Sequence, residues 1–158
     1  MAQQTTATRV ELGSVSAEGV PAITVRLSGA LLALAVAAVH VADQGSITAL
    51  AMPSWIGWGY RFIEVGAVAT AALLLLLPRS VWLVRDWMGW AAGAALGAGP
   101  FIGYVLSRTV GLPGDRGDVG NWGYWVGTVS LFIEAALIIL SLTMLLGYVS
   151  RRAQPGPR

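Results

Sequence analysis

The fold is decided by GYWVGTVSLFIEAALIILSLTMLLGYV, residues 123–149, a stretch in which Glu134 is the only charged side chain. It is longer than the roughly 20 apolar residues that an α-helix needs to cross about 30 Å of hydrocarbon. The chain does not show the alternating ten-residue segments of a transmembrane β-barrel. Further apolar stretches precede it, at residues 22–43, 55–77 and 81–106. The sequence therefore predicts an all-α fold, a four-helix transmembrane bundle formed by residues 22–150.

The composition points to the same class of protein. Of the 158 residues, 56% are hydrophobic and only 11% are charged, whereas an average soluble domain is about 25% charged. We therefore expect the lipid bilayer to be the main partner. A net charge of +2 is too small for a nucleic-acid surface, so no nucleic-acid partner is predicted. The chain has no cysteine, which excludes thiolate nucleophiles and cysteine metal sites.

The placement of arginine predicts the orientation in the membrane. Arginines precede the first apolar stretch, separate the second from the third and follow the fourth. In a chain with four spans these regions share one side of the membrane; the residues are Arg9, Arg26, Arg79, Arg85, Arg151, Arg152 and Arg158. The positive-inside rule makes this side cytoplasmic. We therefore expect a multi-pass protein of the cytoplasmic (inner) membrane with both termini in the cytoplasm. Residues 1–21 and 151–158 are polar or rich in Pro, Gly and Arg, and are predicted to be disordered cytoplasmic tails.

A ridge of glycines marks a helix-packing face. Gly89, Gly93 and Gly97 recur every four residues in the third apolar stretch. Small residues at this spacing allow two helix backbones to approach closely. The pattern favours packing within one molecule, with a dimer interface as the alternative. A homo-oligomer or a larger membrane complex therefore stays open.

The polar residues of the apolar stretches predict an internal site. A carboxylate at the centre of a membrane helix costs roughly 2.5–3.5 kcal/mol even on lenient scales, so such groups need partners away from lipid. At a rise of 1.5 Å per residue, Glu64 and Glu134 both lie near the midplane and are expected to face each other. Other polar residues lie nearer the outer side. The predicted ligand- or ion-binding set of this outward-facing pocket is Glu64, Glu134, Arg61, Arg108, His40, Asp43 and Tyr104.

Metal and cofactor sites are weakly indicated. His40 is the only histidine, which rules out a bis-histidine haem. A copper or haem site using Met52 or Met88 as second ligand is a minor alternative, because Met52 falls in a loop and Met88 on the opposite side. We predict neither a metal nor a cofactor.

A resemblance supports the topology. The run Gly103–Pro113, GYVLSRTVGLP, resembles a phrase of small four-helix membrane proteins of actinobacteria. Those proteins carry an early His-Val pair, here His40-Val41, and acidic residues in the second and last helices, here Glu64 and Glu134. The high Ala, Gly and Arg content without Lys is typical of a GC-rich actinobacterial genome. The resemblance implies four helices and draws attention to Arg108, and it implies no activity.

Three functional interpretations follow, and the first is favoured. It is a non-catalytic membrane protein that binds a small ligand, an ion or a partner subunit through the outward-facing pocket. The alternative is a proton- or cation-coupled carrier or channel subunit that uses Glu64 and Glu134. The third is a membrane enzyme acting on a lipid or quinone, in which two facing carboxyls act as acid and base. The sequence has no catalytic triad order, P-loop or zinc spacing, so no catalytic residue is assigned.

Overall fold

The computed structural model describes residues 19–49, 53–76 and 86–153. Its helices are α1 (Gly19–Gln44), α2 (Ser54–Leu76), α3 (Asp86–Thr109) and α4 (Trp125–Ala153). Each is long and apolar enough to cross a membrane. The predicted all-α bundle of four spanning helices is therefore confirmed. Residues 1–18, 81–85 and 154–158, which carry most of the predicted tails and the start of the third predicted segment, lie outside the described residues.

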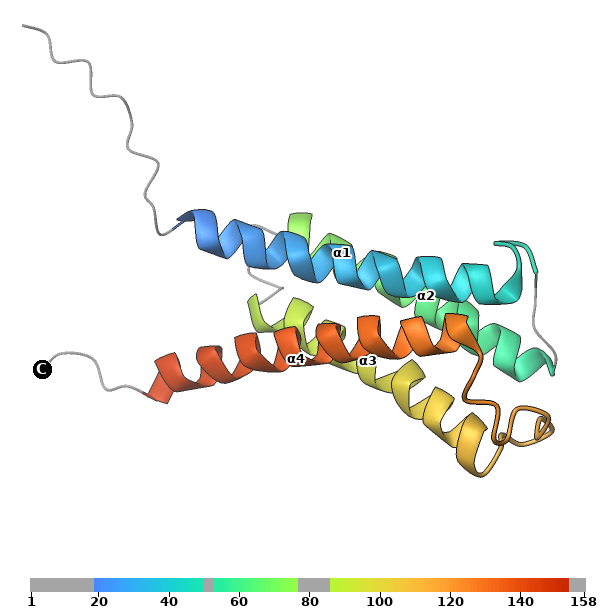
Figure 1. The fold of residues 1–158 in the computed structure, drawn as a ribbon. Helices are drawn as coiled ribbons and strands as arrows, with labels where there is room; N and C mark the ends of the chain where they lie inside the picture. The colour runs from blue at the N-terminus through green and yellow to red at the C-terminus, as the bar shows by residue number, and fades with distance from the viewer. Residues whose placement is uncertain (1–18, 50–52, 77–85, 154–158) are drawn as a thin grey trace, which may run out of the picture.

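The helices run alternately up and down, so Gly19 and Ala153 lie at one end of the bundle (Figure 1). We call this the terminal end. The opposite end, which carries residues 45–49 and 110–124, is called the loop end. Each helix packs against its neighbours along the chain, and α1 also packs against α4. Among the described helices α2 and α4 make no direct contact, so they occupy diagonal positions.

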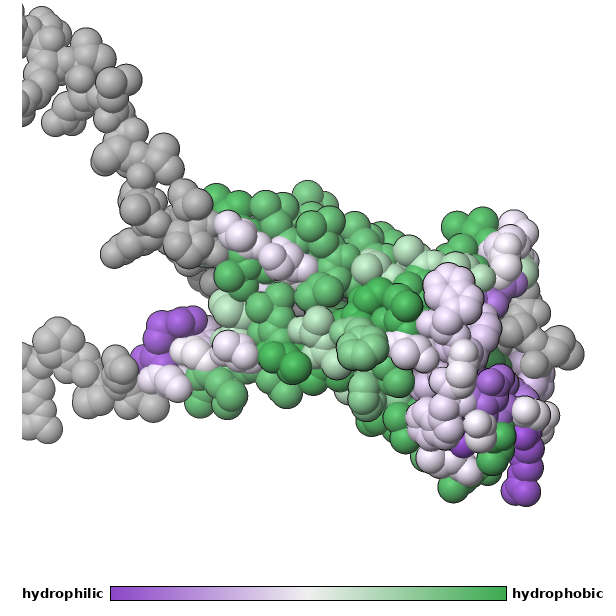
Figure 2. All heavy atoms as spheres, viewed as in Figure 1, coloured by the Kyte–Doolittle hydropathy of each residue, from purple (hydrophilic) through white to green (hydrophobic). Residues whose placement is uncertain are grey.

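The surface of the helices is apolar, as lipid contact requires. Figure 2 shows hydrophobic residues over most of the length of the helices and polar residues gathered at the loop end. Phe62 and Phe132 are 77% and 75% exposed. Such exposure is unfavourable in water and favourable in contact with lipid hydrocarbon. Four of the nine buried hydrophobic residues of the core are alanines, Ala30, Ala33, Ala67 and Ala71. Helix association therefore depends on close backbone packing rather than on hydrophobic burial.

The glycine ridge of α3 lies inside the bundle. A Cβ placed on Gly93 would lie 2.6 Å from Ser141 Oγ, and one on Gly97 would lie 2.9 Å from the carbonyl oxygen of Glu134. Gly89 faces α2 instead, where a Cβ would come within 3.0 Å of Leu74 Cδ2. This half of α3 is thus held tightly against its neighbours in the same chain.

Towards the loop end α3 diverges from α4 (Figure 1). A Cβ at Gly99 or at Gly103 would meet nothing within 4 Å. Gly99 and Gly103, on another face of α3 from Gly93 and Gly97, therefore border open space rather than a neighbouring helix.

We predict opposite effects for alanine at two neighbouring glycines. Gly97→Ala should lower the free energy of unfolding in detergent by about 1–3 kcal/mol, because its methyl group overpacks the contact with the α4 backbone. Gly99→Ala should leave stability unchanged or raise it by up to about 1 kcal/mol, because alanine is the better helix former. Thermal unfolding followed by circular dichroism measures both. Equal stability of the two variants would contradict this packing.

Candidate functional site

A cavity of about 1010 Å³ extends from the loop end into the terminal-end half of the bundle, from Asp115 of the loop to Leu73 of α2. It lies mainly between α2 and α3, and α1, α4 and the loop before α4 contribute to its wall. Its volume is at the upper end of the roughly 300–1,000 Å³ typical of small-molecule pockets. The ionisable and aromatic residues of its lining are His40, Asp43, Trp55, Tyr60, Phe62, Tyr104, Arg108, Asp115, Asp118, Tyr124 and Glu134.

Asp43, in the last turn of α1, is held by two tyrosines. The hydroxyl of Tyr60 in α2 donates to Asp43 Oδ2, and the hydroxyl of Tyr124 donates to Asp43 Oδ1 at 2.6 Å. The bond to Asp43 raises the pKa of Tyr124 to about 12, so this hydroxyl keeps its proton and donates at neutral pH. Asp43 therefore ties α1 to α2 and to the segment that leads into α4.

Arg108 connects the end of α3 to the following loop. Its Nη1 pairs with Asp118 Oδ2, and its guanidinium lies 4.6 Å from the ring centre of Tyr104. The arginine is only 5% exposed. The position of its partner depends on how the loop turns back over the helix end.

The loop turns back because of two glycines with positive φ. Gly111, at φ 80°, ends α3 and donates to the carbonyl of Leu106 at 2.9 Å. Pro113-Gly114 then forms a tight turn in which Asp115 N donates to the carbonyl of Leu112 at 2.9 Å, and Gly114 has the φ of 77° that such a turn requires. The indole of Trp55 donates to the Pro113 carbonyl at 3.2 Å, which fixes the turn against the start of α2.

Glu134 lies deepest of the ionisable groups in the cavity wall. It is nine residues into α4 from Trp125, or about 13 Å at the rise of a helix, and it is 1% exposed. Ser130 donates a hydrogen bond to Oε1. His40 Nε2 lies 3.8 Å from the same oxygen, a distance at which the two form an ion pair when His40 is protonated.

Three buried polar atoms in this wall have no hydrogen-bond partner within the described part of the chain. They are Glu134 Oε2, Arg108 Nε and the Tyr104 hydroxyl oxygen. Leaving such a group unsatisfied costs about 1–3 kcal/mol. Each of these atoms is almost fully covered, so an occupant of the cavity would reach it only if a neighbouring side chain moved.

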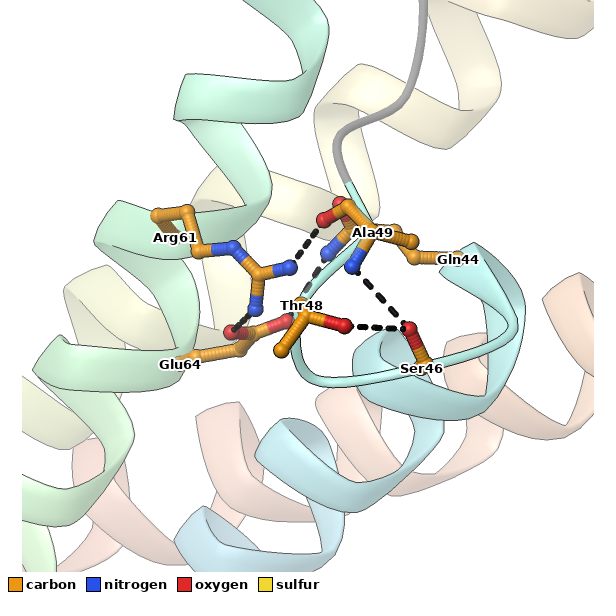
Figure 3. Close-up of polar contacts among 6 residues, drawn as sticks. All are labelled: Gln44, Ser46, Thr48, Ala49, Arg61 and Glu64. Carbon is orange, nitrogen blue, oxygen red and sulfur yellow. Dashed lines mark hydrogen bonds and ion pairs between the residues drawn. The ribbon is translucent and has the colours of Figure 1, made fainter.

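Glu64 belongs to a different cluster (Figure 3). Its carboxylate accepts from Arg61 Nη1 and, at 2.9 Å, from Gln44 Nε2. Arg61 also donates through Nη2 to the carbonyl of Ala49. Neither Glu64 nor Arg61 lines the cavity. This cluster joins the end of α1 and the residues after it to the loop-end half of α2.

The expected single pocket is therefore two separate arrangements. Of the predicted site residues, His40, Asp43, Tyr104, Arg108 and Glu134 line one cavity. Glu64 does not line this cavity, and α2 and α4 lie diagonally in the bundle. That Glu64 and Glu134 face each other stays a prediction. Arg108, expected near the buried acids, pairs with Asp118 of the loop.

The predicted site residues did not include Tyr60, Tyr124 or Ser130. Tyr124 stands between Trp122 and Trp125, and an interfacial aromatic belt accounts for such a cluster without any polar contact. Ser130 precedes Glu134 by one helical turn, and this spacing was a usable signal for its hydrogen bond.

No three His, Asp or Glu side chains come together as metal ligands within the described residues. Of the two methionines considered with His40, Met52 lies outside the described residues. Met88 lies in the first turn of α3, at the terminal end, whereas His40 lies in the last two turns of α1 near the loop end.

Comparison of the chain with protein-family models, with curated proteins and with solved structures gave no match.

We predict that the Glu64 cluster stabilises the bundle. Glu64→Ala should lower the free energy of unfolding in detergent by about 3 kcal/mol, because it leaves Arg61, whose side chain is 20% exposed, without its anionic partner. The double variant Arg61→Leu with Glu64→Leu should recover most of this loss, since an apolar pair of similar size leaves no charge behind. Wild-type stability of Glu64→Ala would contradict the role assigned to the pair.

Proposed function

We propose that this protein is a non-catalytic integral membrane protein that binds a small ligand in the loop-end cavity. The observation that carries the proposal is a cavity of ligand size whose lining residues hold three of the five buried side-chain atoms without a hydrogen-bond partner among the described residues. These three are Glu134 Oε2, Arg108 Nε and the Tyr104 hydroxyl. The other two, Gln44 Oε1 and Ser141 Oγ, belong to residues outside the lining.

The ligand enters from the outer side of the cytoplasmic membrane in this proposal. The terminal end carries Arg151 and Arg152, whereas the loop end carries Arg108 and Arg116 together with the acids Asp43, Asp115 and Asp118. The positive-inside rule then places the terminal end, and with it both termini, in the cytoplasm. The composition without Lys supports an actinobacterial source.

The structure bears differently on the other two interpretations. A carrier needs an acid along its pathway, and of the two glutamates only Glu134 lines the cavity, so it alone is suited to that role. An enzyme using Glu64 and Glu134 as acid and base needs both at one substrate, and only Glu134 lines the cavity, which argues against it. Gly93 and Gly97 pack against α4 of the same chain, which argues against a dimer formed on that ridge.

A cavity-filling variant tests the proposal. Leucine at Gly103 has room for its Cβ and would occupy the cavity, whereas leucine at Gly147, a helical glycine near only the flexible Arg151 side chain, would not. Native mass spectrometry of protein purified in mild detergent should show a bound small molecule in the wild type and in Gly147→Leu. We expect Gly103→Leu to have lost it.

Two results would contradict the proposal. One is a wild-type protein that carries no bound molecule under conditions in which it stays folded. The other is equal occupancy in Gly103→Leu and Gly147→Leu, which would place the bound molecule outside the cavity.

A further inference from the structure

The cavity wall has more acidic than basic groups. Its acids are Asp43, Asp115, Asp118 and Glu134, and its basic residues are Arg108 and His40. Arg108 is already paired with Asp118. Even if His40 is protonated and pairs with Glu134, Asp43 and Asp115 have no cationic partner among the described residues. A ligand that adds positive charge would offset this excess.

The acids lie among aromatic rings. Tyr60, Tyr104, Tyr124 and Trp55 all line the cavity. The guanidinium of Arg108 already lies 4.6 Å from the ring centre of Tyr104 and 5.9 Å from that of Tyr124. Ring faces attract organic cations, and most strongly where water is excluded. The loop-end part of the wall thus has two features that recognise a weakly hydrated cation.

Towards the terminal end the wall becomes apolar. There it is formed by small and aliphatic residues of two facing helices, such as Gly66 and Leu73 of α2 and Ala92 and Leu96 of α3. A Cβ on Gly66 would touch only Leu96 Cδ1, at 3.8 Å, so this part has room for an apolar group. A bare metal ion would make no contact with this apolar part of the wall, and water would gain no hydrogen bonds from it.

The same wall is unsuited to anions. A phosphate or carboxylate head group would approach the acids, and Arg108, the one arginine of the wall, has its charge engaged by Asp118. Like-charge juxtaposition of this kind is a common means of rejecting the wrong partner. Anionic lipids are therefore poor occupants.

From these three features we propose that the ligand is a hydrophobic organic cation, an amine or an onium ion with an apolar body. Its charge lies among Asp43, Asp115, Glu134 and the tyrosines, and its apolar part extends between α2 and α3. Glu134 Oε2, buried and without a partner among the described residues, is the group placed to meet the charge at depth. This inference rests on the proposed function and adds the chemical class of the ligand to it.

Two ions of the same shape and opposite charge test the inference. Tetraphenylphosphonium and tetraphenylborate differ in charge and little in size. Equilibrium dialysis against full-length protein in a neutral detergent should show saturable binding of the phosphonium and at least tenfold weaker binding of the borate. Equal binding of the two ions, or tighter binding of the borate, would overturn the inference.

Two matched carboxylates locate the charge. Glu134→Gln keeps an acceptor for Ser130 and removes the charge, and it should weaken phosphonium binding at least tenfold. Glu64→Gln removes a carboxylate that does not line the cavity, and it should change binding less than twofold. Asp115→Asn should weaken phosphonium binding about threefold. Because Asp115 lies in the loop, this variant still tests the inference if a substitution inside the membrane prevents folding. Unchanged binding in Glu134→Gln and Asp115→Asn would overturn the inference.

The outcomes separate this inference from the proposed function. If Gly103→Leu loses a bound molecule and the phosphonium does not bind, the cavity binds ligands and the cationic class is wrong. If neither ion binds and Gly103→Leu keeps its bound molecule, both the class of ligand and the binding function are wrong.

Discussion

Hydrocarbon offers no hydrogen-bond partners, and this constraint organises the molecule. Each ionisable side chain described at depth in the four helices has turned towards another part of the protein. Asp43 accepts from two tyrosines, Glu64 from Arg61 and Gln44, and Glu134 from Ser130. Because the outward faces are apolar, these contacts can form only in the interior or at the loop end. The polar groups therefore fix which faces of the helices meet.

Small residues decide where the interior is closed and where it stays open. Gly93 and Gly97 bring the backbones of α3 and α4 together in the terminal-end half. Beyond them α3 departs from α4, and the ring of Tyr104 fills part of the gap by packing on Gly127, where a Cβ would lie 2.0 Å from Tyr104 Cε2. The cavity lies mainly on the other side of α3, between α3 and α2. One face of α3 thus packs tightly on α4 while another borders the cavity.

The sequence predicts the helices well because span length and apolar composition are local properties. It also predicts which face of each helix is polar, because that follows from a period of 3.6 residues. It does not predict which helices are neighbours. Glu64 and Glu134 have matching depths, yet they lie on diagonal helices, and no periodicity within one helix carries that information. The sequence does not predict the ion pair of Arg108 with Asp118 either, because that pair depends on the turns at Gly111 and Gly114.

Our central proposal is that the cavity takes up a ligand from the aqueous side at the loop end, past the end of α3, and cysteine labelling tests it most directly. The chain has no cysteine of its own, so the reagent can label only the single cysteine that each substitution introduces. Gly103 lines the cavity, whereas its neighbour Ile102, at the same depth, is 54% exposed and does not line it. In lipid nanodiscs, a charged methanethiosulfonate reagent should modify Gly103→Cys quickly and Ile102→Cys slowly or not at all. Equal protection of both cysteines, or faster modification of Ile102→Cys, would contradict the account.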